Sequence, residues 1–116
     1  MRPTVTFNTF DVVRVPFPFT DKKASKFRPA LVLSDASSFN VPSGHAVMAM
    51  ITSADNPPWP LDTPVRNLAT AGLPSASIVR CKIFTLDVRL VSNVVGTLSD
   101  DDRKQVQASL SALMPN

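Results

Sequence analysis

Apolar residues occur along this chain in short runs that polar or proline-rich segments separate. The first run, 10–15, is rich in β-branched residues and ends at Pro16, so it predicts a strand that proline closes. Two later runs, 28–34 and 45–52, are apolar at consecutive positions. That pattern is typical of strands buried on both faces or at a tight interface, and we interpret 45–52 as a central strand.

The remaining segments predict shorter or irregular structure. Residues 36–44 form a polar turn region, and 53–64 holds four prolines around Trp59, which excludes regular structure there. Further strands are predicted over three segments, 76–79, 82–87 and 90–98.

The last element has a helical pattern. Ser99 is a favourable N-cap, and the acidic run 100–102 places negative charge at the positive end of a helix dipole. Val106, Leu110 and Leu113 recur at helical spacing and form one apolar stripe. We interpret the acidic run as a helix cap in preference to a metal site, because three consecutive side chains in a first turn cannot all point one way.

Five or six short strands and one amphipathic helix predict a mainly β fold, a small curved sheet or partly open barrel. The 116 residues suffice for one domain, 1–116. Cys81 has no Cys or His at ligand spacing, so neither an internal disulfide nor zinc is expected. The chain shows no signal peptide or membrane-spanning run, which favours a cytoplasmic location.

The charge is modest overall but uneven. The formal net charge is +3, and all the acids are Asp. Residues 1–98 carry ten Lys or Arg against six Asp, and 21–28 alone holds four bases and one acid. Such an excess attracts phosphate backbones, although a solvated surface loop would have the same composition. No Gly-rich phosphate loop is present, which argues against nucleotide hydrolysis and leaves no cofactor expected.

The order of motifs resembles the MazF/PemK family of toxins. Asp-Val-Val-Arg-Val and Pro-Phe-Pro-Phe-Thr-Asp occupy 11–15 and 16–21, and Arg-Pro-Ala-Leu-Val-Leu-Ser and Ile-Thr-Ser occupy 28–34 and 51–53. The resemblance extends over roughly 10–113. Two departures are Phe10, where the family has Gly, and the tripeptide at 80–82.

The resemblance implies an SH3-like barrel with a C-terminal helix that acts as a metal-independent endoribonuclease on single-stranded RNA. It also implies a homodimer with RNA across both subunits, and a cognate antitoxin whose acidic, disordered tail competes for that surface. Arg28 and Thr52 match the family's catalytic Arg and Thr. Arg28 suits stabilisation of phosphoryl charge, and Thr52 could donate to the same phosphate, with Ser53 a weaker candidate.

Each catalytic assignment has a structural alternative. Arg28 could be a strand-entry residue that is either solvated or paired with Asp11 or Asp35, and Thr52 could be a β-former at a strand end. His45 titrates in the right range for a general base but matches no catalytic position of the family.

The RNA-binding candidates fall into two groups, basic and aromatic. Lys22, Lys23 and Lys26 would contact phosphates without reading bases. Phe19 and Trp59 could stack on unpaired bases, as could Phe17 and Phe27. For Phe17 and Phe19 a role as core or dimer-contact residues is favoured over stacking, and Trp59 could equally be a hydrophobic lid or part of the antitoxin surface. Two further functions stay open, a non-enzymatic toxin of this fold that binds DNA gyrase and an inactive relative that binds RNA or antitoxin.

Overall fold

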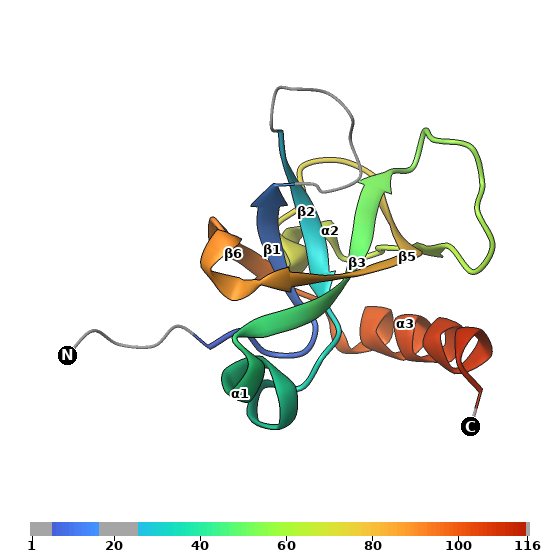
Figure 1. The fold of residues 1–116 in the computed structure, drawn as a ribbon. Helices are drawn as coiled ribbons and strands as arrows, with labels where there is room; N and C mark the ends of the chain where they lie inside the picture. The colour runs from blue at the N-terminus through green and yellow to red at the C-terminus, as the bar shows by residue number, and fades with distance from the viewer. Residues whose placement is uncertain (1–5, 17–25, 116) are drawn as a thin grey trace.

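The computed structural model describes residues 6–16 and 26–115, in which six strands form one antiparallel sheet. The sheet is strongly curved, with the strand order β4-β5-β3-β2-β1-β6, and α3 lies along one side of it (Figure 1). The strands are β1 (Asp11–Pro16), β2 (Phe27–Val32), β3 (His45–Ser53), β4 (Thr63–Pro64), β5 (Ser77–Asp87) and β6 (Asn93–Thr97). The α-helices are α1 (Val41–Ser43), α2 (Leu68–Ala71) and α3 (Asp100–Leu113).

The two apolar runs form neighbouring strands inside the sheet, as predicted. β3 lies between β5 and β2, and β2 lies between β3 and β1. Leu31 of β2 packs into a cluster on one face of the sheet, while its neighbours Ala30 and Val32 pack into a cluster on the other. Because both faces are covered, consecutive apolar residues replace the alternating pattern of a half-exposed strand.

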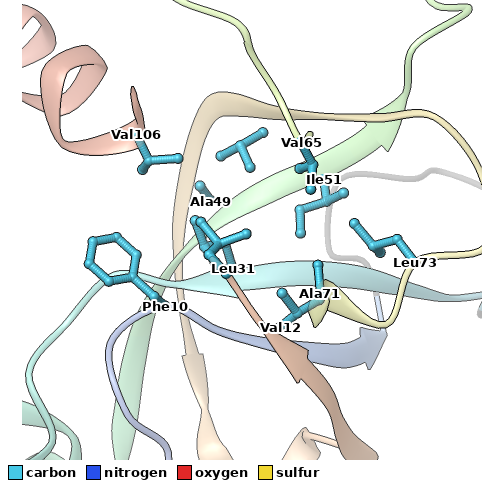
Figure 2. Close-up of a cluster of buried hydrophobic side chains, with 11 residues drawn as sticks. Phe10, Val12, Leu31, Ala49, Ile51, Val65, Ala71, Leu73 and Val106 are labelled. Carbon is cyan, nitrogen blue, oxygen red and sulfur yellow. The ribbon is translucent and has the colours of Figure 1, made fainter. Parts of the chain in front are cut away.

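The first core lies between the sheet, α3 and the segment around α2. Val106 of α3 points toward the side chains of β2 and β3 (Figure 2). The buried residues of this first core are Phe10, Val12, Leu31, Ala49, Ile51, Val65, Ala71, Leu73, Val79, Leu98 and Val106. The second core lies on the opposite face and comprises Phe7, Val13, Val15, Ala30, Val32, Ala46, Met48, Phe84 and Leu86.

The C-terminal helix begins as predicted. Ser99 Oγ accepts a hydrogen bond from the Asp102 amide at 3.3 Å. Asp102 is 1% exposed and turns inward, where its carboxylate accepts hydrogen bonds from the Arg66 and Asn67 amides. The acidic run therefore caps the helix and also joins it to the loop before α2.

Several predicted elements are wrong in detail. Residues 36–44 form a π-helical turn (Ala36–Asn40) followed by α1, because Asp35 caps the turn by accepting from the Ser38 amide. The two strands predicted at 76–79 and 82–87 are one strand, β5. The strand predicted at 90–98 is a 3-10 turn (Val88–Leu90) followed by β6. The irregular stretch at 53–64 ends in the two-residue strand β4.

No helix in residues 6–16 and 26–115 is long and apolar enough to cross a membrane.

Candidate functional site

A pocket of about 210 Å³ opens where the start of β2 lies beside the end of β3, and Arg14 of the next strand, β1, also lines it. One wall consists of strand residues and the other of the segment that follows α2. Its lining residues are Arg14, Arg28, Pro29, Ile51, Thr52, Ser53, Gly72, Leu73, Pro74, Ser75, Ser77 and Val95. The structure therefore brings together three of the residues that the sequence singled out, Arg28, Thr52 and Ser53.

Arg28 is the second residue of β2 and is exposed at the pocket. Among the described residues no ion pair joins it to Asp11 or Asp35, the two partners proposed from sequence. Asp11 instead accepts from the Asn8 amide, and hydrogen bonds from Ser38 lower the pKa of Asp35 in the cap of its turn. The Arg28 guanidinium is thus available to a bound anion.

Thr52 and Ser53 end β3 and present hydroxyls to the same pocket. Thr52 is 9% exposed, and its Oγ1 accepts a hydrogen bond from Asn56 Nδ2 at 2.6 Å. Ser53 is exposed, and its Oγ accepts from the Asp55 amide at 3.1 Å. Both hydroxyls keep a hydrogen that can be donated to a ligand.

Arg14 is a second cation in the pocket, and the sequence analysis missed it. It lies in β1 between Val13 and Val15, which are fully buried, while Arg14 itself is exposed. A charged residue between two buried valines was the available signal, because alternate strand residues point to opposite faces. Two guanidinium groups beside two hydroxyls form a donor-rich, positively charged site that suits a phosphate.

Two glycines determine where the second pocket wall, the segment that follows α2, can lie. A Cβ built on Gly72 would meet the backbone of Val95, and one built on Gly96 would meet the backbone of Thr70 and Ala71. Gly72 also has a φ of 72°, which favours glycine. The end of α2 and β6 therefore touch backbone to backbone, and this contact sets the position of the wall.

Trp59 belongs to the loop between β3 and β4, where its ring packs against Arg80 and Lys82 of β5, and it does not line the pocket. The Lys82 ammonium is 4.8 Å and the Arg80 guanidinium 5.6 Å from its ring centroid, distances at which cations attract aromatic rings. Arg80 also forms two hydrogen bonds with Asp62, from Nε at 3.1 Å and from Nη2 at 3.0 Å. The indole is 42% exposed, so part of it is accessible to a ligand.

The backbone of 59–62 makes a tight turn at this point. The Asp62 amide donates to the Trp59 carbonyl at 3.2 Å, and the Trp59 amide donates to Asp62 Oδ2 at 3.0 Å. Pro60 takes the second position and Leu61, with a φ of 66°, the third. This is the pattern of a type II turn, in which glycine is preferred where Leu61 stands.

The other RNA-binding candidates are only partly placed. Lys26 is exposed immediately before β2 but does not line the pocket, and Phe27 is 44% exposed at the start of that strand. Lys22, Lys23, Phe19 and Phe17 lie outside the described residues.

His45 and Cys81 do not line the pocket. His45 begins β3 seven residues before Thr52, which at about 3.3 Å per residue places the two roughly 23 Å apart along the strand. Its Nδ1 is 3.0 Å from the Ser43 carbonyl.

Burial raises the pKa of the Cys81 thiol, and the nearby Asp62 carboxylate adds to the rise. In the part of the chain that the structure describes, no group of Cys, His or Asp side chains is arranged to hold a metal ion.

Comparison with known proteins identifies the class to which this fold and pocket belong. Residues 8–114 match the family described as PemK-like, MazF-like toxin of type II toxin-antitoxin system. Because the match covers nearly the whole chain, the protein belongs to this toxin family. A search of curated protein sequences returns no match.

Solved structures agree on the fold. A crystal structure of MazF from Deinococcus radiodurans superposes with a TM-score of 0.74 at 21% identity, covering 97% of this chain and all of the other. A MazE-MazF structure from the same organism gives 0.75 at 22% identity, covering 95% and 97%. An endoribonuclease in complex with its cognate antitoxin, from a mycobacterial species, gives 0.71 at 13% identity, covering 94% and 93%. At these identities the likeness establishes the fold.

Proposed function

We propose that this toxin is a metal-independent endoribonuclease that cleaves single-stranded RNA by attack of the 2′-hydroxyl on the adjoining phosphate. The observation that carries the proposal is the meeting of Arg28 and Thr52, from different strands, in one cationic pocket. In this reaction the RNA supplies its own nucleophile. The 2′-hydroxyl loses its proton as its oxygen bonds to phosphorus, and the 5′-oxygen takes up a proton as its bond to phosphorus breaks, which leaves a 2′,3′-cyclic phosphate and a free 5′-hydroxyl.

The role we assign to the pocket is electrostatic. Negative charge builds up on the phosphoryl oxygens as the 2′-oxygen attacks, and fixed donors aimed at those oxygens lower the barrier. Arg28 can donate two parallel hydrogen bonds to a phosphate, and Thr52 can donate a third. Arg14 would contact the same or a neighbouring phosphate. Both guanidinium groups are assigned as hydrogen-bond donors to phosphate, and neither is assigned as the base.

Substrate and partners follow from the same proposal. We infer that the whole chain, 1–116, acts as one toxin domain in the cytoplasm, as a homodimer, with Lys22, Lys23, Lys26, Phe19, Ser53 and Trp59 contributing to RNA binding. A cognate antitoxin is inferred because structural neighbours are described in complexes with MazE or a cognate antitoxin. Light scattering should give a mass of twice 12.5 kDa.

The direct test is incubation with mixed-sequence single-stranded RNA in excess EDTA. We expect cleavage at a recurrent short motif with cyclic phosphate ends, and loss of about 100-fold or more in rate for Arg28→Ala. Arg66→Ala is the matched control, because Arg66 is exposed and does not line the pocket. Intact RNA with a folded dimer would refute the nuclease proposal and direct attention to DNA gyrase binding or to an inactive relative that binds antitoxin.

A further inference from the structure

The Thr52 hydroxyl receives a hydrogen bond from a residue beyond its own strand. Asn56 Nδ2 donates to Thr52 Oγ1 at 2.6 Å. A hydroxyl has one hydrogen to donate and two lone pairs to accept. When Asn56 occupies one lone pair, the hydroxyl hydrogen must point elsewhere, and Thr52 lines the pocket. The contact therefore favours Thr52 as a donor toward a pocket ligand.

Asn56 is held in place by the turn that follows β3. Its amide donates to the Ser53 carbonyl at 3.1 Å, and the Asp55 amide donates to Ser53 Oγ, also at 3.1 Å. The next residue, Pro57, is fixed through its carbonyl, which accepts from Arg80 Nη2 at 2.8 Å. The backbone on both sides of Asn56 is thus fixed.

Arg80 connects this turn to the rest of the loop 54–62. It is 7% exposed and bonds both the Pro57 carbonyl and the Asp62 carboxylate. One buried guanidinium on β5 therefore secures the loop near its start and at its end. The loop swings out from the end of β3 before it returns to β4 (Figure 1). Its anchoring limits the motion of the Asn56 amide relative to Thr52.

We propose that Asn56 is a positioning residue that orients the Thr52 hydroxyl as a hydrogen-bond donor to the phosphoryl oxygen of bound RNA. The inference rests on the proposed nuclease function and adds a residue to it. A donor oriented before the substrate binds costs no reorganisation as charge develops, so it acts on the chemical step more than on binding. Asn56 itself touches no reacting atom.

The test measures single-turnover cleavage at saturating RNA, together with the Kd of an RNA whose cleavage site carries a 2′-deoxy sugar. We expect Asn56→Ala to lower the saturating rate by about 3- to 10-fold, as for one neutral hydrogen bond, with Kd nearly unchanged. Asn56→Asp should lose about 100-fold, because its carboxylate accepts the hydroxyl hydrogen and repels phosphate. Asp55→Ala is the matched control in the same turn, since its exposed side chain is not used in this argument.

A double-mutant cycle separates positioning from a purely structural role. In a Thr52→Val background the hydroxyl is absent, so Asn56→Ala should have no further effect on the rate. An equal loss in both backgrounds would overturn the inference, as would an Asn56→Asp enzyme as fast as the wild type. If the wild type cuts RNA and the Asn56 variants match Asp55→Ala, the inference alone fails. If the wild type cuts no RNA, the proposed function fails and the inference with it.

Discussion

At the scale of single residues, two side chains occupy a backbone conformation that normally favours glycine. Phe10 has a φ of 73° and Leu61 a φ of 66°. Phe10 is buried in the first core, and the Arg103 guanidinium lies 5.6 Å from its ring centroid. Leu61 is 37% exposed at the third position of its turn. Packing therefore offsets the strain at Phe10 far more than at Leu61, which explains how a phenylalanine is tolerated at position 10.

The same substitution at these two positions should have opposite effects. A left-handed residue costs about 1–2 kcal/mol, while removing a buried Phe side chain costs about 3–5 kcal/mol. Phe10→Gly should therefore lower the free energy of unfolding by about 2 kcal/mol. Leu61→Gly should raise it by up to about 1 kcal/mol, the gain being reduced by glycine's freedom in the unfolded chain. Urea denaturation measures both, and a shift of the same sign in the two variants would contradict this explanation.

Asp87 should titrate at unusually low pH. Hydrogen bonds from the Arg89 side chain and amide lower its pKa from 3.8 to about 2. Because the folded-state pKa lies below the unfolded one, the ionised carboxylate favours the folded state above pH 3.8, and this contribution is lost as the pH falls toward 2. NMR titration of the side-chain carboxyl carbon should show the low pKa in the wild type. Arg89→Ala should move it up toward 3.8, and an unmoved value would exclude Arg89 as the cause.

At the scale of elements, the sequence predicted strands and the capped helix where local pattern determines structure. Ser99 caps the helix that follows it, and the consecutive apolar residues of β2 and β3 indicate that these strands are buried on both faces. Two separate strands were predicted at 76–79 and 82–87, and this prediction was wrong because the chain between them forms a bulge within β5. There Ala49 pairs with Ile83 while the next residue, Met50, pairs with Arg80. An unpaired segment of this kind depends on the partner strand, which single-sequence patterns do not reveal.

Arg80 lies at this bulge and anchors the loop 54–62 through its hydrogen bonds to Pro57 and Asp62. Arg80→Met should lower the free energy of unfolding by about 3 kcal/mol, because it leaves the largely buried Asp62 carboxylate without its partner. Trp59 is the only tryptophan, so its emission should shift to longer wavelength as the loop loosens. Arg89→Met removes an ion pair whose arginine side chain is 87% exposed and screened by solvent, so it should change stability far less than Arg80→Met does. Equal effects of the two variants would disprove the anchoring role.

At the scale of the whole molecule, the pocket combines residues from 14 to 95. Arg28 and Thr52 could be predicted because each lies within a recognisable motif. Arg14 and the wall at 72–75 could not, because their place in the site depends on the order of strands in the sheet. Asn56 could not either, because its role comes from one hydrogen bond made by a folded loop.

Each of the two pocket arginines should contribute to the salt dependence of RNA binding. Each phosphate contact to single-stranded nucleic acid contributes about 0.7 to the slope of log K against log salt. For binding of the non-cleavable RNA, Arg14→Ala and Arg28→Ala should each reduce the slope of log K against log salt by about that amount. Arg66→Ala, which removes the same charge away from the pocket, should leave the slope unchanged. A reduction as large for Arg66→Ala would mean that overall charge, and not the pocket, governs binding.

The close backbone contact between the end of α2 and β6, at Gly72 and Gly96, matters for how such a toxin can be inactivated. A methyl group at Gly96 would press on the backbone of Thr70 and Ala71, just before the pocket wall. A genetic selection for cells that survive expression of this protein should therefore recover substitutions at Gly96 as well as at Arg28 and Thr52. Survivors of this kind would carry an intact set of phosphate ligands in a misshapen site. Substitutions that inactivate the toxin should thus extend beyond the residues that line the pocket.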